Sequence, residues 1–507
     1  MSVHHSSDSS DSVGAASTVA PTQDLEKAFA DGQNKELAQQ DVQDTAIDKF
    51  RVELSPEEDP KNMSVFRKWL AVLVISTAAF CVTSCSSAAA FTEEGTQIDF
   101  GASTEVAILG VSLFVQGLGL GPLLAGPLSE LYGRNVVYRA SFFLFWVFTF
   151  PVAFAPNMAV FLVFRWITGF CGAAFLSVAG GSIGDMFANH EVATPMALFT
   201  VSPFIGPAVG PLIAGFITQH TTWRWLYRVF LIWNFLQVVC LILFVRETYA
   251  PVLLKWKAAR LRKSENDSRY YCGLDRHDGL WDSIKKSCYV PFQLIVLDRM
   301  ALLLDLWSAL LLGILYLAFQ VFPIIFGVGH HFNTQSVGMS FLGIGIGMVV
   351  AVACTPFWNS VYRRETEKHK GSPPPEMRLL IGMVGAVITP ISLFWLAFTT
   401  YPHVHWIVPI IASVFLGLGI VFCFTAVFTY LVVAYRPVAA SAMAGNTFIR
   451  TTFAAAFPLF AGQMYNKLGT VGATALLAGL TTIIAPLPFI FYRIGARLRA
   501  SSKFAAA

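Results

Sequence analysis

The chain has 507 residues, of which 55% are hydrophobic and only 13% are charged, and its net charge is +4 at pH 7. A soluble globular domain usually carries about 25% charged residues, so this composition excludes an ordinary soluble protein and indicates a membrane protein. The small net charge gives no reason to expect nucleic acid as a partner. The eight cysteines lack the paired spacing of a zinc or redox site, so we expect no metal and no cofactor.

The first 60 residues are the most polar part of the chain. They contain 13 Asp and Glu against 4 Lys and Arg, a Ser-rich opening, MSVHHSSDSSDS, and no apolar segment. Such a composition cannot build a core. It predicts a disordered acidic tail rather than a secretory signal.

Apolar stretches of about twenty residues, the length that crosses a bilayer, follow this tail and alternate with short polar breaks. We predict twelve transmembrane helices, near residues 69–91, 104–126, 138–155, 158–182, 195–218, 225–245, 300–326, 336–358, 378–399, 406–430, 441–464 and 471–492. The fold class is therefore an all-α membrane protein with two six-helix bundles. The implied division is an acidic tail at 1–60, bundles at 61–245 and 300–492, a central loop at 246–299 and a short basic tail at 493–507.

Basic residues gather in alternate breaks, and cytoplasmic loops are the ones that carry excess Lys and Arg. They include Lys61, Arg67, Lys68, Arg134, Arg139, Arg246, Arg260, Lys285, Arg363, Arg364, Lys368, Arg493 and Arg497. The breaks at 92–103, 327–335 and 400–405 contain none. We therefore expect both termini and the central loop to lie in the cytoplasm.

The two sets of six helices also resemble each other. A shift of 247 residues places MALFT at 196–200 on MAGNT at 443–447 and PLIAG at 211–215 on PLFAG at 458–462. Parallel repeated halves with a site between them are typical of transporters.

The fifth predicted helix contains SPFIGPAVGPLIAGF at 202–216. Its four-residue spacing puts prolines along one face and small residues along the neighbouring face, where another helix can approach closely. We interpret this segment as a stiff pivot between the two halves, formed by Pro203, Gly206, Pro207, Gly210, Pro211 and Gly215.

Several motifs resemble those of the major facilitator superfamily. They are GPxxGP at 206–211, GPLSELYGRN at 126–135 with Glu130 where Asp is usual, and RWITGFCGAA at 165–174. The segments DPKNMSVFRKW at 59–69, RETYAPVLL at 246–254 and YLVVAYRPVAASAMAGNTFIR at 430–450 resemble the fungal drug:proton antiporter branch with twelve spans. Two positions depart from that branch, with Val433 and Gln320 where acids are common.

Ionisable residues inside a bilayer are costly and tend to be functional. The resemblance implies a role in proton coupling for Arg165, which would otherwise be a structural arginine held by carbonyls. Asp305 either carries protons or reaches toward the headgroups. Asn446 and Arg450 lie one helical turn apart and form either a substrate or anion site or a helix-packing network. The predicted substrate cavity contains Gln116, Tyr316, Phe319, Gln320, Phe424, Phe428, Asn446 and Arg450.

The loop GPLSELYGRN predicts a cytoplasmic gate formed by Gly126, Glu130, Gly133, Arg134 and Asp185. We expect the two glycines to form a tight turn. A helical turn would then place Glu130 and Arg134, four residues apart, on one side. The resemblance implies that Asp185 pairs with Arg134. This leaves Glu130 free to approach the amino end of the eleventh helix, near residues 440–442.

The resemblance implies a proton-coupled exporter of small amphipathic molecules in the plasma membrane, with the vacuolar membrane as the alternative. Its expected partners are a small-molecule substrate, protons and the lipid bilayer, and we expect a monomer. A polyamine exporter or an importer on the same fold remains an alternative. An enzyme would need a histidine with an acid, or a metal cluster, near one membrane face, and the sequence has no such constellation.

Overall fold

The regular secondary structure of the described chain is helical apart from one isolated β-bridge, and the chain forms two compact units. The computed structural model describes residues 50–187, 191–272, 280–368 and 374–505. The smaller unit contains residues 50–53 and 254–272, and the larger unit contains the rest of the described chain. The acidic segment before residue 50 lies outside the described residues, so the disorder predicted for it stays a prediction.

The smaller unit joins the end of the acidic segment to the central loop. The backbone N–H of Val52 donates to the Tyr271 carbonyl at 3.0 Å, and the N–H of Tyr271 donates to the Phe50 carbonyl at 3.1 Å. The Lys257 ammonium donates to the Glu53 carbonyl at 2.9 Å. Residues 50–53 are therefore structured, and the predicted boundary of the tail at residue 60 lies too far along the chain.

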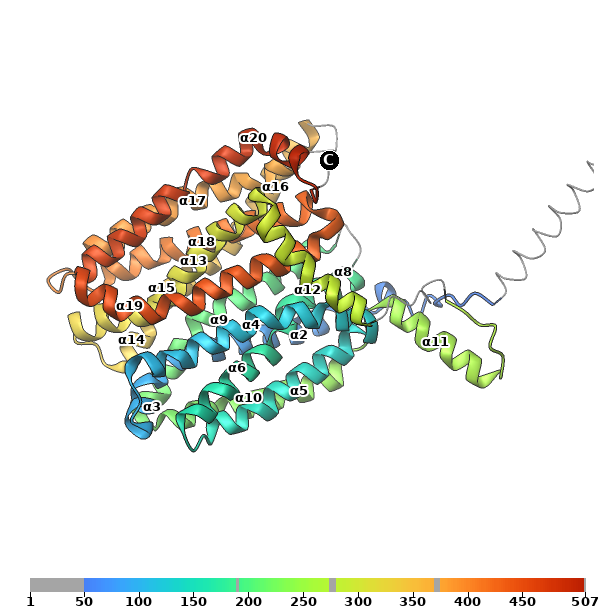
Figure 1. Ribbon diagram of the computed structural model, residues 1–507, viewed down its shortest axis with the longest axis horizontal. Helices are drawn as coiled ribbons and strands as arrows, with labels where there is room; N and C mark the ends of the chain where they lie inside the picture. The colour runs from blue at the N-terminus through green and yellow to red at the C-terminus, as the bar shows by residue number, and fades with distance from the viewer. Residues whose placement is uncertain (1–49, 188–190, 273–279, 369–373, 506–507) are drawn as a thin grey trace, which may run out of the picture. The chain divides into compact units, whose positions relative to one another are not determined.

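The larger unit consists of long helices, coloured from blue to red along the chain in Figure 1. In its first half they are α2 (Val65–Ala88), α3 (Glu93–Phe100), α4 (Thr104–Tyr132), α5 (Arg134–Ala153), α6 (Met158–Gly172), α7 (Ala174–Ser177), α8 (Ala179–Met186), α9 (Ala193–His220) and α10 (Trp223–Phe244). The central loop contains α11 (Ala250–Ser264) and α12 (Leu280–Leu297). The second half contains α13 (Arg299–Phe322), α14 (Thr334–Ser340), α15 (Leu342–Ala353), α16 (Thr355–Lys368), α17 (Leu380–Phe398), α18 (Ile407–Ala434), α19 (Ala439–Ile484) and α20 (Leu487–Ser501).

Eleven helical stretches in the described residues are long and apolar enough to cross a membrane. The last of them, Ala439–Ala500, has 62 residues, far more than one crossing needs. Gly469 interrupts it with φ 70° and ψ 171°, a positive-φ conformation that glycine adopts without a steric penalty. This stretch therefore contains both the eleventh and the twelfth predicted crossings.

The two halves repeat the same helix packing. The first crossing packs on the fifth (α2 on α9), and the seventh packs on the eleventh (α13 on α19). The second packs on the fourth (α4 on α6), and the eighth packs on the tenth (α15 on α18). A Cβ on Gly169 would overlap the Phe114 backbone, and one on Gly417 would overlap that of Ile344. Glycine thus permits a close helix approach in each half.

The fifth crossing, α9, is one continuous helix despite its three prolines. A Cβ on Gly206 would lie 2.8 Å from Thr83 Cβ, and one on Gly210 would lie 3.1 Å from the backbone nitrogen of Ala88. These glycines therefore pack against α2 within the same half, as expected for small residues at a helix contact. The pivot between halves stays a prediction, because Gly206 and Gly210 do not face the second half.

The far end of α9 does meet the second half. A Cβ on Gly215 would lie 3.2 Å from Gly338 Cα, and one on Gly338 would lie 2.6 Å from the Pro211 carbonyl oxygen. The Phe91 ring also lies 6.2 Å from the Phe341 ring, measured between centroids. We call the end of the molecule where these residues meet the opposite end. We call the other end, which contains Arg134 and the other basic breaks, the basic end. The halves are thus closed against each other at the opposite end.

Prolines inside α9 leave carbonyl groups without their helical N–H donors. Pro203 has no N–H to donate to the Phe199 carbonyl, and the Ser202 hydroxyl donates to that carbonyl instead, at 2.7 Å. Pro207 is buried, as is Pro211. A side-chain hydroxyl thus compensates for one of the missing backbone bonds, as expected for prolines in membrane helices.

Candidate functional site

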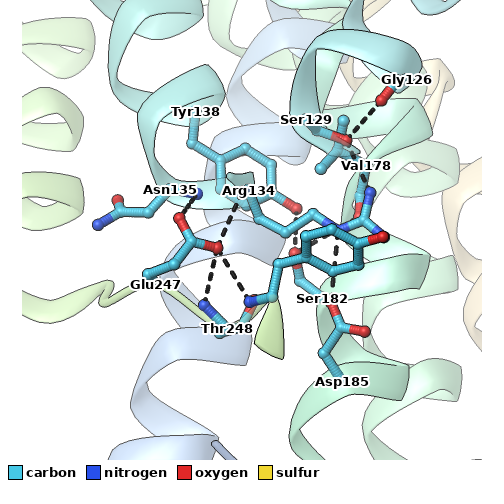
Figure 2. A network of polar contacts seen from close by, with 11 residues as sticks. Gly126, Ser129, Arg134, Asn135, Tyr138, Val178, Ser182, Asp185, Glu247 and Thr248 are labelled. Carbon is cyan, nitrogen blue, oxygen red and sulfur yellow. Dashed lines mark hydrogen bonds and ion pairs between the residues drawn. The ribbon is translucent and has the colours of Figure 1, made fainter. Parts of the chain in front are cut away.

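A polar cluster at the basic end joins the second, third and fourth crossings (Figure 2). The Arg134 guanidinium donates through Nε to Asp185 at 3.3 Å and through Nη1 to the Ser129 hydroxyl at 2.7 Å. Its carbon Cζ also lies 4.6 Å from the centre of the Tyr249 ring. The contact predicted between Arg134 and Asp185 is therefore confirmed. Their side chains are 11% and 24% exposed, so the ion pair is only weakly screened by water.

Glu247, the acid of the RETYAPVLL segment, is the centre of the same cluster and was not among the predicted site residues. Its Oε1 accepts from the backbone N–H groups of Arg134 at 2.9 Å, Thr248 at 3.0 Å and Tyr249 at 2.9 Å. Its Oε2 accepts from the N–H of Asn135 at 3.1 Å. A carboxylate thus caps the amino end of α5, where free N–H groups and the helix dipole favour an anion (Figure 2).

The predicted turn of this loop needs two corrections. Gly126 lies inside α4 rather than in a turn, and only Gly133, with φ 105°, forms the break between α4 and α5. Because Gly133 separates the two helices, Glu130 and Arg134 do not lie on one helical turn. Glu130 is exposed and has no ion pair or hydrogen bond among the described residues. Its proposed approach to the eleventh crossing stays a prediction.

The Tyr249 side chain borders this cluster at the edge of the membrane-spanning region. Burial raises the pKa of its phenol, and the nearby Glu130 carboxylate raises it further. The phenol therefore stays neutral at physiological pH and offers the Arg134 guanidinium an uncharged aromatic face.

Arg165 is buried in the middle of the first half, at 1% exposure. Its Nε donates to the Gly110 carbonyl at 2.8 Å, and Nη1 and Nη2 both lie 3.4 Å from the Cys85 carbonyl oxygen. Its Cζ lies 4.2 Å from the centre of the Phe114 ring. Within the described part of the chain no carboxylate pairs with it. Carbonyls and an aromatic face hold the cation in place, and its charge is left unneutralised.

Asp305 and Asn446 join the seventh and eleventh crossings. The Asn446 amide donates to Asp305 Oδ1 at 2.9 Å and to the Ser308 hydroxyl at 2.7 Å. All three residues are buried: Asp305 is 2% exposed, and Asn446 and Ser308 are both 0% exposed. Asp305 therefore does not reach the headgroups, and for Asn446 the geometry matches a helix-packing network.

Arg450 lies one turn beyond Asn446 and faces aromatic rings. Its Cζ lies 5.4 Å from the centre of the Phe424 ring and 4.8 Å from that of Phe428. Its Nε is buried and has no hydrogen-bond partner in the described residues. Phe204 of α9 stacks on Phe424 with centroids 5.2 Å apart, so the second half meets the first across this aromatic layer.

Of the remaining predicted cavity residues, Tyr316 and Gln320 contact the first half. The Tyr316 hydroxyl shares a hydrogen bond with Ser86 at 3.0 Å, and the Tyr316 and Phe319 rings meet edge to face. The Gln320 amide donates to Glu93 at 2.7 Å. Gln116 is partly buried and forms no hydrogen bond among the described residues.

Glu93 was missed because its sequence position lies in a predicted outer break. In the structure α3 continues the first crossing, so this acid reaches Gln320 on the seventh crossing. Gln320 on the seventh crossing thus pairs with an acid at the end of the first crossing. Only the tertiary contact reveals this pair.

The family comparison decides the identity of the chain. Residues 72–458 match the Major Facilitator Superfamily. The chain belongs to this superfamily. It is a multi-pass membrane transporter rather than an enzyme.

Several curated relatives of this facilitator are fungal proteins. Efflux pump atB of Aspergillus terreus is 43% identical over 90% of each chain. The probable drug/proton antiporter YHK8 of Saccharomyces cerevisiae is 40% identical over 89% of this chain and 88% of its own. The multidrug transporter mdrA of Aspergillus fumigatus is 37% identical over 89% of this chain and 75% of its own.

Solved structures confirm the facilitator fold. A D-xylose-proton symporter matches with a TM-score of 0.60 at 16% identity, over 84% of this chain and 97% of its own. A partially occluded, inward-open xylose transporter from E. coli matches with a TM-score of 0.59 at 16% identity, over 84% of this chain and 98% of its own. At this identity the likeness concerns the fold alone.

Proposed function

We propose that this facilitator exports small amphipathic organic molecules in exchange for protons. The observation that carries the proposal is its similarity, over about nine-tenths of the chain, to proteins named as an efflux pump and a probable drug/proton antiporter. The buried Arg165 and Asp305 support it, because ionisable groups inside a membrane protein commonly mark ion pathways. The protein acts as a monomer in the plasma membrane, with its termini and basic end in the cytoplasm.

Arg165 and Asp305 are the proposed proton-coupling residues. An unneutralised cation in a low-dielectric interior disfavours protonation of nearby acids. Asp305 is hydrogen-bonded to Asn446, and Arg450 lies one helical turn beyond Asn446 on the same crossing. Movement of the halves then changes the potential at Asp305 and releases its proton.

The cluster around Arg134 and Glu247 is the proposed cytoplasmic gate. In this conformation the halves are closed at the opposite end, where Gly215 meets Gly338. The cluster lies within the first half and holds the loop between the second and third crossings in a defined shape. Closure at the basic end then brings the exposed Glu130 to the positive amino end of the eleventh crossing.

Transport by purified protein in liposomes tests the function. We expect uptake of ethidium or carboxyfluorescein when the vesicle interior is acidic, and loss of uptake when an ionophore collapses the proton gradient. Uptake that needs an acidic exterior would indicate a symporting importer. Uptake that is insensitive to collapse of the gradient would contradict proton exchange.

A further inference from the structure

A cavity of about 340 Å³ lies between α9 of the first half and α15 to α18 of the second, on the basic side of the molecule. Apolar side chains dominate its wall, among them Met196, Phe204, Met348 and Trp358. Ligand cavities commonly have volumes of about 300–1,000 Å³. An engineered cavity of about 150 Å³ holds benzene, so this one accommodates a molecule of about two rings.

Arg378 is the one charged side chain on the wall of this cavity in the described residues. Its Cζ lies 3.6 Å from the centre of the Tyr362 ring, so the guanidinium is held in place by stacking. Its Nε is buried without a hydrogen-bond partner, and no acid of the described chain pairs with it. Arg378 is partly buried. The planar donors of its guanidinium match a carboxylate in two parallel hydrogen bonds.

A second arginine lies one aromatic layer deeper. Phe204 forms part of the cavity wall, and its ring stacks on Phe424 at 5.2 Å and on Phe428 at 6.5 Å between centroids. Arg450 lies over the Phe424 and Phe428 rings, and its buried Nε also lacks a partner in the described residues. An anion that passes Phe204 therefore moves from one unpaired guanidinium toward another.

We propose that this cavity binds amphipathic organic carboxylates of about two rings, with the carboxylate on Arg378 and the rings against the apolar wall. The cavity is the first binding site on the transport path from the cytoplasmic side, and Phe204 separates it from the centre of the protein. The place of this site on the transport path rests on the proposed transport function, whereas ligand binding at the site does not. A binding assay without a proton gradient therefore tests the site independently of the transport assay.

Binding of three matched probes to purified full-length protein tests the proposal. They are naphthaleneacetic acid, its neutral amide, and naphthylmethylamine, which have the same rings and different charges. We expect the acid to bind at least tenfold more tightly than the amide and the amine. Arg378→Gln should reduce the preference for the acid over the amide to about twofold or less, because it removes the charge and keeps the side chain polar. Arg363→Gln, an exposed arginine on the neighbouring α16, is the matched control and should retain the full preference.

A wild-type protein that binds the acid no more tightly than the amide would overturn the proposal without any variant. An unchanged preference in folded Arg378→Gln would overturn it as well. Displacement of the acid by short-chain phosphatidylserine at lower concentration than by unlabelled acid would assign the site to lipid instead. Thr200→Trp, which fills the cavity from α9, should weaken all three probes together.

Discussion

Removal of the Glu247 carboxylate should destabilise the first half of the protein. In Glu247→Ala the N–H groups of Arg134 and Asn135, at the start of α5, lose their acceptor, as do those of Thr248 and Tyr249. Hydrogen bonds to a charged group contribute roughly 1.5–3 kcal/mol each, and loss of an anion at a helix amino end costs roughly 0.3–1 kcal/mol more. Water reaches some of the freed groups, so we expect a total loss of about 3 kcal/mol rather than the full sum. Glu247→Gln keeps one acceptor oxygen and should lose about 1 kcal/mol.

Thermal unfolding of the purified proteins, followed by circular dichroism at one scan rate, ranks the stability of the wild type, Glu247→Gln and Glu247→Ala. Fixed scan rate matters because large membrane proteins often unfold irreversibly. Glu130→Ala is the matched control, because Glu130 is an exposed acid on the same connection without a partner in the described chain, and it should change stability by less than about 0.5 kcal/mol. Equal unfolding midpoints for Glu247→Ala and Glu130→Ala would refute the capping argument.

Three further predictions follow from the buried contacts. Arg165→Ala should abolish proton-coupled uptake in liposomes while the protein still reaches the membrane, since its charge is the one expected to act on the proton; retained uptake would make Arg165 a packing residue. Asp185→Asn should slow turnover and increase cysteine labelling at the basic end, because Arg134 loses its ion pair. Unchanged labelling would show that the Arg134–Asp185 ion pair is not part of the gate. Gly210→Val should lower the yield of folded protein several-fold, because its side chain would overlap α2, whereas Gly462→Val, where a Cβ meets no atom within 4 Å, should be tolerated; equal yields would contradict the proposed α2–α9 contact.

The helices and their repetition could be predicted from the sequence because local patterns determine them. A stretch of about twenty apolar residues has to cross the bilayer as a helix, since its backbone groups have no other partners there. Positions such as Gly206 and Gly210 likewise indicate a close contact before its partner is known, because only small residues allow one. The pairing of Arg134 with Asp185 was available from motif resemblance, and the structure confirms it.

The sequence did not indicate the partners of Glu247 and Gln320, because those partners lie far apart along the chain. Glu247 reaches the start of α5 across 113 positions, and Gln320 reaches Glu93 across 227. The glycine face of α9 could have met either half, and only the packing of α2 decided that it lies within the first. The cavity at Arg378 likewise exists only where four helices of one half face a helix of the other. Hydrophobic length determines crossings locally, whereas charge partners and cavities depend on how the crossings are arranged in space.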